Sequence, residues 1–211
     1  MYKNIVFIDF DGTITTEDTL TGAILPFVDP KEFKEYNGKL FSGEMTLSQV
    51  VRYAYDDRPA EWMPKMLEYI DGVEIRPGFE QFLDEMQARR IPVVVISGGF
   101  RQFSQRKLAP YMDKITALHA VEMSVDGDRI KLLSDYDDGN ELLKKTDVMA
   151  HYQYEHAIGI GDSLTDKNMA RAVDTCFARD VLAEYLDKIG KSYEPYENFY
   201  QVIEKLREIL S

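Results

Sequence analysis

The first side chains that could perform chemistry are two carboxylates, Asp9 and Asp11, which stand two positions apart and are followed by Gly12 and Thr13. They come directly after the apolar run 5–8, which predicts a short, buried strand of a parallel sheet. Acids at the carboxyl end of such a strand lie where open α/β sheets bind ligands. We therefore expect both to belong to an active site, with a solvated turn as the alternative for an isolated pair of this kind.

A second candidate site element follows the β-branched segment 91–96, which predicts another buried strand and breaks into Ser97, Gly98 and Gly99. Glycines let the backbone approach an anion closely, amides at a helix start point toward it, and the serine hydroxyl adds a donor. The sequence thus predicts an anion site here, with a plain strand-to-helix turn as the alternative.

A third strand, predicted at 156–160, leads to Asp162 and Asp166, and the lysine pair Lys144 and Lys145 precedes it. Several acids converging on one sheet edge repel each other unless a divalent cation lies among them, and hard oxygen ligands suit Mg²⁺. A lysine and the anion site would supply a phosphate pocket. Neighbouring helical residues differ by about 100° around the axis, so only one lysine can point inward.

These residues need a scaffold that brings strand ends together. Strands alternate with helical patterns through most of the chain, which predicts an α/β, Rossmann-like fold, a parallel sheet with helices on both faces. We expect further strands at 115–118 and 175–178, a hairpin at 125–128, and helices at 79–90, from 181 and at 200–210. Helical periodicity between the first strand and residue 76, with Thr46 and Gln49 as a capping box, predicts an inserted helical domain. The expected domains are a core of 1–15 and 77–211 and a cap of 16–76.

Composition limits the function classes. The net charge of −12 over 211 residues argues against nucleic acid and anionic membranes as partners. The single cysteine, Cys176, excludes an internal disulfide and fits a reducing compartment. The apolar run near the start is too short for a signal or membrane segment. We expect a soluble, cytoplasmic protein that is a monomer or homodimer.

Taken together, the motifs resemble those of the haloacid dehalogenase superfamily. They read DFDGT at 9–13, ISGG at 96–99, a lysine, and GDSLTD at 161–166, in the family's order and over nearly the whole chain. The insert after the first motif is similar to the small cap of the subgroup that contains the phosphoserine phosphatases. The resemblance implies a phosphatase with a capped Rossmann-like core.

Two late segments give a closer resemblance. Residues 176–180 (CFARD) and 195–200 (PYENFY) are similar to the phosphatases of methionine salvage that act on 2-hydroxy-3-keto-5-methylthiopentenyl 1-phosphate. The segment 135–143 departs from that family's pattern, which is rich in cysteines just before the family lysine, because this chain has none there. Substrate identity is therefore left open between this enol phosphate, phosphoserine and another small phosphorylated metabolite.

The family resemblance implies roles for the acids and the lysine. Asp9 would be the nucleophile that forms an aspartyl-phosphate, and Asp11 the general acid and base whose backbone carbonyl also binds Mg²⁺. Asp162 and Asp9 would bind the metal directly. Asp166 would either bind the metal too or hold the metal and the lysine in position. Lys145 matches the motif lysine better than its neighbour does.

The same resemblance implies the substrate contacts. Asp18 falls where related phosphatases carry a substrate-contacting acid, and Arg52 could meet a substrate carboxylate or be a solvated helix residue. The phosphate-binding residues would be Gly12, Thr13, Ser97, Gly98 and Gly99. The rival interpretations are a phosphomutase, a phosphoacceptor signalling module and a catalytically inactive binding protein.

Overall fold

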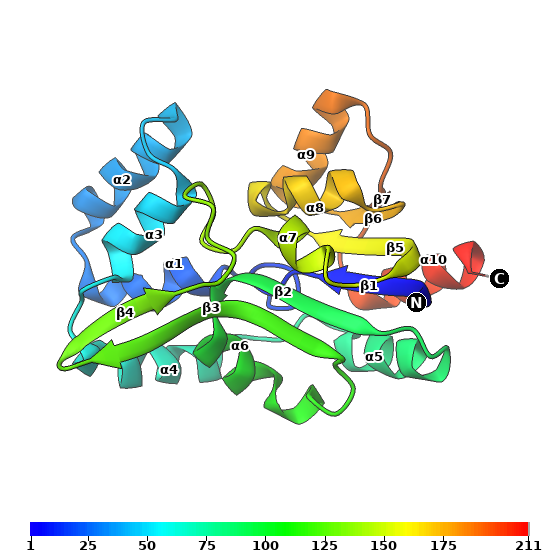
Figure 1. Ribbon diagram of the computed structural model, residues 1–211, viewed down its shortest axis with the longest axis horizontal. Helices are drawn as coiled ribbons and strands as arrows, with labels where there is room; N and C mark the ends of the chain where they lie inside the picture. Colours follow the sequence, from blue (N-terminus) through cyan, green and yellow to red (C-terminus); the bar gives the residue numbers. More distant parts are fainter. Residues whose placement is uncertain (211) are drawn as a thin grey trace.

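The structure is a computed structural model that describes residues 1–210, the side chain of Phe41 excepted. Its core is a seven-stranded sheet in the order β4-β3-β2-β1-β5-β6-β7, in which all neighbours are parallel except β3 and β4 (Figure 1). The strands are β1 (Tyr2–Ile8), β2 (Val93–Phe100), β3 (Ala117–Asp126), β4 (Arg129–Leu133), β5 (Tyr154–Gly161), β6 (Thr175–Ala178) and β7 (Glu194–Pro195). The helices are α1 (Thr19–Ile24), α2 (Pro30–Ser42), α3 (Leu47–Tyr55), α4 (Met63–Gly72), α5 (Phe79–Ala88), α6 (Arg101–Leu108), α7 (Lys145–Met149), α8 (Lys167–Ala172), α9 (Asp180–Ile189) and α10 (Phe199–Ile209).

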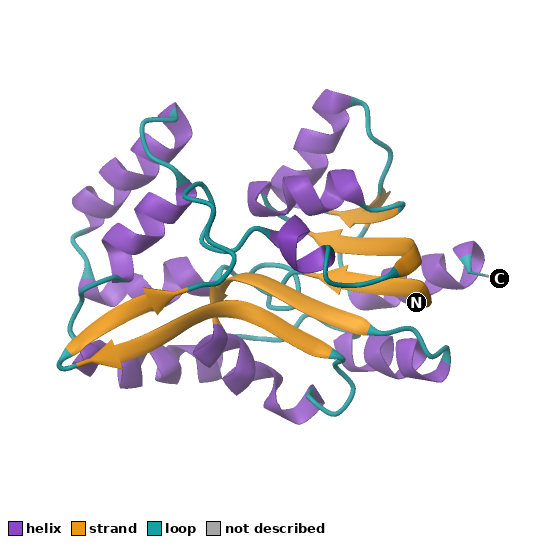
Figure 2. Ribbon diagram, viewed as in Figure 1, coloured by secondary structure: helices purple, strands orange, loops and turns teal. Residues whose placement is uncertain are grey.

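Helices cover both faces of the sheet, as predicted (Figure 2). Along β1, Ile5 and Phe7 join the apolar cluster that includes residues of α7, α8 and α9, whereas Val6 and Ile8 join the cluster built with α5 and α10. Because successive strand residues point to opposite faces, this alternation buries β1 on both sides. The predicted α/β, Rossmann-like fold is confirmed.

Two strands are longer than expected, and both differences bear on the site. β2 does not break at Ser97 but continues to Phe100, with an irregular register against β3 between Ile96 and Phe100. The Ser-Gly-Gly segment is therefore strand backbone and not the start of α6. Of the predicted short strand at 115–118, residues 117 and 118 begin the long β3, whereas 115 and 116 precede it. β3 turns at Gly127 into β4, so the hairpin prediction is confirmed.

The helical insert between β1 and α5 comprises α1 to α4. The capping box at the start of α3 is present, because the Thr46 hydroxyl accepts a hydrogen bond from the Gln49 amide and the Gln49 side chain accepts one from Thr46. α4 packs against α1 and α6, while α2 and α3 rise beside the β3–β4 hairpin and face α8 and α9 (Figure 1). Within residues 1–210, no helix is long and apolar enough to cross a membrane.

Candidate active site

The centre of the site is a buried ammonium held between two carboxylates, one directly after β1 and the other directly before α8. Lys145 is 1% exposed, and its Nζ donates hydrogen bonds to Asp9 Oδ1 and, over 2.5 Å, to Asp166 Oδ1. Asp9 is itself 3% exposed and is fixed by its amide, which donates to the Ile160 carbonyl of β5 over 3.0 Å. Lys144 is instead partly exposed and pairs with Asp147 at 3.1 Å. Of the two lysines, Lys145 is therefore the one at the sheet edge.

Three carboxylates form an oxygen cluster beside this pair. One oxygen from each of Asp9, Asp162 and Asp166 lies within 4.8 Å of the others. Asp166 accepts hydrogen bonds from the amides of Asp162 (3.0 Å) and Ser163 (3.1 Å), and Thr13 Oγ1 donates to Asp162 Oδ1 over 2.8 Å. A rigid, all-oxygen donor set of this kind fits a hard cation such as Mg²⁺.

The electrostatics of the cluster support a cation as well. Burial, followed by the charge of Asp166, raises the pKa of Asp9 well above its usual value and that of Asp162 to about 8. Burial opposes the charge of Lys145, but the charges of Asp166 and Asp9 outweigh it and raise the lysine pKa. Three carboxylates stand around one ammonium, and a divalent cation would balance the remaining negative charge.

Asp11 lies apart from this cluster, and two hydroxyls hold its carboxylate. Thr19, fully buried at the start of α1, donates to Asp11 Oδ1, and Ser97 Oγ donates to Oδ2 over 2.8 Å. Burial, then the charge of Asp18, raises the pKa of Asp11 to about 6, against the lowering by both hydroxyls. A Cβ on Gly99 would lie 2.5 Å from Asp11 Oδ2, which explains the glycine. The acid is thus oriented from the core and from the insert.

Arg76 shapes the turn that follows β1 and Asp9. It is 6% exposed, and its guanidinium donates to the carbonyls of Thr13 (2.8 Å), Gly12 (2.5 Å) and Thr15 (3.1 Å). Gly12 has φ +80°, and a Cβ there would lie 2.4 Å from Asp162 Oδ2. The turn therefore packs directly behind the Asp162 carboxylate, and only glycine fits.

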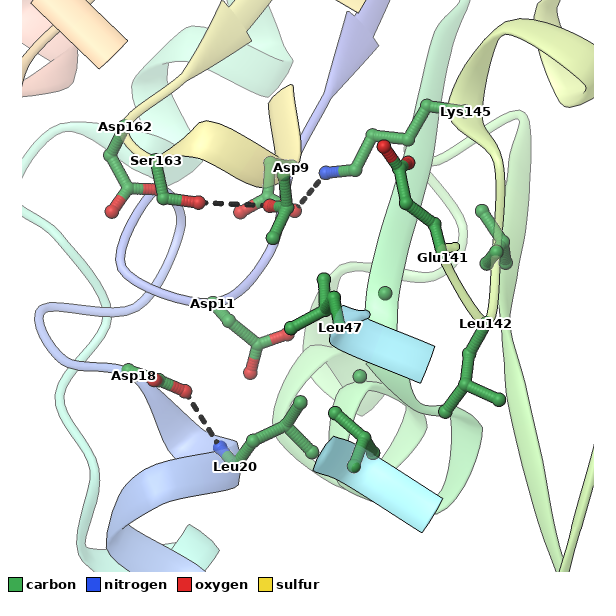
Figure 3. Close-up of a pocket in the computed structure, with 15 residues that line it drawn as sticks. Asp9, Asp11, Asp18, Leu20, Leu47, Glu141, Leu142, Lys145, Asp162 and Ser163 are labelled. Atoms are coloured by element: carbon green, nitrogen blue, oxygen red, sulfur yellow. Dashed lines mark hydrogen bonds and ion pairs between the residues drawn. The ribbon is translucent and has the colours of Figure 1, made fainter. Parts of the chain in front are cut away.

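These groups open into a cavity of about 240 Å³ between the insert and the core. Figure 3 shows Asp9, Asp11 and Asp162 on one side of it and Lys145, Glu141 and Leu142 on the other. Its apolar wall consists of five side chains from α1, α3 and the loop before α7: Leu20, Leu47, Val51, Leu142 and Leu143. The volume suits a small metabolite with an apolar part.

Not every predicted site residue faces this cavity. Among the predicted phosphate-binding residues, Gly98 and Gly99 line it, while Gly12, Thr13 and Ser97 lie behind it. Asp18 lines it and also caps α1, accepting from the amides of Leu20 and Thr21. Arg52 is not among the lining residues, because it pairs with Asp137 (2.6 Å) and Asp56 (3.3 Å).

Three residues of the site were not predicted from the sequence. Thr19 follows the predicted Asp18 but had no recognisable motif of its own, and Arg76 was interpreted only as part of the turn before α5. Glu141 stands four residues before Lys145, in the segment that departs from the salvage phosphatases, and that departure was the only signal for it.

The model of the haloacid dehalogenase-like hydrolase family matches residues 6–171, and this chain belongs to that family. A 2-hydroxy-3-keto-5-methylthiopentenyl-1-phosphate phosphatase of Microcystis aeruginosa is 36% identical over 206 residues, which cover 97% of this chain and 98% of that protein. A phosphatase of the same name from Lysinibacillus sphaericus is 27% identical over an alignment that covers 99% of this chain and 96% of that protein. The predicted family and enzyme class, a phosphatase, are confirmed.

Solved structures agree in fold. A phosphoserine phosphohydrolase-like protein from Francisella tularensis superposes with a TM-score of 0.75 at 17% identity and covers 98% of this chain and 100% of its own. A phosphoserine phosphatase with a phospho-aspartyl intermediate analogue gives a TM-score of 0.68 at 18% identity, covering 100% and 98%.

Proposed function

We propose that this chain is a Mg²⁺-dependent phosphomonoesterase that forms an aspartyl-phosphate on Asp9, and that its substrate is 2-hydroxy-3-keto-5-methylthiopentenyl 1-phosphate. The observation that carries the proposal is the buried Lys145 between Asp9 and Asp166, beside a three-carboxylate cluster and below a cavity with an apolar wall. The names of the relatives support the substrate.

In the first step an Asp9 oxygen attacks phosphorus, a P–O bond to the enzyme forms, and the bond to the leaving oxygen breaks. Lys145 opposes the rise in the pKa of Asp9 that burial causes and orients its carboxylate, and it offsets the charge of the approaching phosphate. Bound Mg²⁺, held by Asp9, Asp162 and the Asp11 carbonyl with Asp166 beside them, would neutralise charge on the transferring group. Gly98 and Gly99 line the cavity, where the Gly98 amide would supply a donor for the phosphoryl oxygens, whereas the Gly99 amide already donates to Ser97 Oγ over 2.9 Å.

Asp11 moves the protons. In the first step its carboxyl protonates the leaving oxygen, and in the second it removes a proton from the water that attacks phosphorus. The products are the alcohol and inorganic phosphate, and both aspartates return to their starting states. The hydrogen bonds from Thr19 and Ser97 support this role because they fix the direction of the carboxylate.

The cavity wall favours the salvage compound over phosphoserine. Phosphoserine carries a carboxylate and an ammonium, whereas the enol phosphate ends in an uncharged methylthio group. Among the described lining residues, Lys145 is the only lysine or arginine, and two carboxylates already occupy it. Leu47 and Val51 instead offer an apolar surface to the far end of a substrate. The fold likeness to phosphoserine phosphatases does not decide the substrate.

We further propose the domain boundaries 1–15 with 77–211 for the core and 16–76 for the cap. The two segments in which the chain passes between core and cap lie side by side. Thr15 and Ile75 form an antiparallel bridge, and the Arg76 amide donates to the Ile14 carbonyl over 2.8 Å. The partner would be one small phosphorylated metabolite. A cytoplasmic location and a monomeric or dimeric state stay predictions.

The test is Mg²⁺-dependent phosphate release from a panel of phosphomonoesters that includes the enol phosphate and phosphoserine, with Asp9→Asn as the control. We expect the enol phosphate to be turned over far faster than the others, and no turnover in the variant. Preferred turnover of phosphoserine would refute the substrate assignment. Release that persists in Asp9→Asn would refute the mechanism.

A further inference from the structure

Glu141 is an acidic residue of the cavity wall to which the chemistry above gives no task. It lies in the loop between β4 and α7, directly before Leu142 and Leu143, whose buried side chains form part of the apolar wall. Figure 3 shows its carboxylate on the side of the cavity where Lys145 reaches Asp9. This half-buried carboxylate therefore faces the cavity beside the Lys145 ammonium.

The Glu141 side chain is held in place but keeps acceptor capacity. Asn168 Nδ2 of α8 donates to Glu141 Oε1 over 3.1 Å, and the Glu141 amide donates to Asp138 Oδ1 over 3.0 Å. Within residues 1–210, the second carboxylate oxygen accepts no hydrogen bond from another residue. A fixed side chain with a free acceptor can recognise a donor on a ligand without first losing rotamer freedom.

We propose that Glu141 is a specificity residue, whose free oxygen accepts a hydrogen bond from a hydroxyl on the carbon next to the phosphoester carbon. This inference rests on the proposed phosphatase function and deepens it. The same charge disfavours leaving groups that carry a carboxylate, since two like charges would be brought together in a water-poor cavity. The site then selects uncharged, hydroxylated phosphomonoesters whose far end is apolar.

The test compares kcat/KM for three esters of similar size: 2-hydroxypropyl phosphate, propyl phosphate and 2-carboxyethyl phosphate. The enzymes are the wild type, Glu141→Gln, Glu141→Met and the control Glu155→Gln, an exposed glutamate at the opposite end of β5. Relative to propyl phosphate, we expect Glu141→Gln to lower the value for the hydroxylated ester about tenfold and to raise that for the carboxylated ester by a similar factor. Glu141→Met, which removes the acceptor, should lower kcat/KM for the hydroxylated ester further.

Three results would overturn the inference. Unchanged kcat/KM values for all three esters in both Glu141 variants, with an active wild type, would show that the carboxylate does not contact the leaving group. An equal loss on all three esters would assign Glu141 a structural task instead. Failure of the wild type to hydrolyse any ester, including the enol phosphate, would remove the proposed function itself, a result distinguishable from the first two.

Discussion

Replacement of Lys145 by methionine should both abolish catalysis and destabilise the folded protein. Methionine keeps much of the volume of lysine but removes the charge, and it leaves Asp9 and Asp166 without their common partner. The neighbouring Lys144 offers a matched control, because its ammonium is partly exposed and pairs only with Asp147 among the described residues.

The magnitude follows from burial. Lys145 and its two partners are 1%, 4% and 0% exposed in their side chains, so solvent screens their interaction little. Removing one member of a buried ion pair costs about 3–5 kcal/mol. For a chain of this size, that corresponds to a fall in Tm of about 6–20 °C. Lys144→Met, a surface change, should shift stability by no more than about 0.5 kcal/mol.

The assay is thermal unfolding of wild type, Lys145→Met and Lys144→Met without divalent cations, followed at several pH values. In Lys145→Met, Asp9 loses the charge that opposes the raising of its pKa by burial. A carboxyl with a raised pKa binds protons more tightly in the folded state, so its ionisation destabilises the fold as pH rises. The deficit should therefore be smaller at about pH 5 than at about pH 8. Equal Tm values for the two variants, or a deficit that grows in acid, would refute the reasoning.

Two further predictions concern Asp11 and the metal site. Thr19→Val should slow hydrolysis of alkyl phosphates about tenfold or more, because it removes a hydrogen bond that orients Asp11. The leaving group of p-nitrophenyl phosphate needs no proton, so the first burst of nitrophenolate from that ester should persist. An equal loss on both esters would contradict this role. Without cations, stability should fall as pH rises through about 6 and about 8, since ionisation of Asp11 and Asp162 is disfavoured in the fold. Mg²⁺ should flatten this decline in wild type but not in Asp162→Asn, as unfolding curves with and without chelator would show.

The sequence was informative wherever structure is local. The buried strand before Asp9, the Thr46 capping box and the turn at Gly127 follow from short patterns of hydrophobicity, capping and turn chemistry, and all three are present. The convergence of Asp9 and Asp162 also follows from the pattern, because parallel strands bring their carboxyl ends to one edge.

What the sequence left open depends on contacts between distant segments. Gly99 stays in β2 because the strand pairs onward with β3, which no local signal for a turn reveals. Arg76 contacts carbonyls more than 60 positions away, and an arginine before a Pro-Gly turn gives no indication of that. Arg52 had two interpretations, and its partner Asp137 lies 85 positions along the chain. Such pairings need the tertiary fold.

The central claim is that Asp9 carries the phosphoryl group, and rapid-quench labelling tests it most directly. Enzyme, Mg²⁺ and a substrate with a radiolabelled phosphoryl group would be mixed, quenched in acid, digested and mapped. We expect label on the peptide that contains Asp9, none in Asp9→Asn, and accumulated label in Asp11→Asn with a good leaving group, because the water is then not activated. Turnover without any trapped label in Asp11→Asn, or label on another residue, would contradict the account.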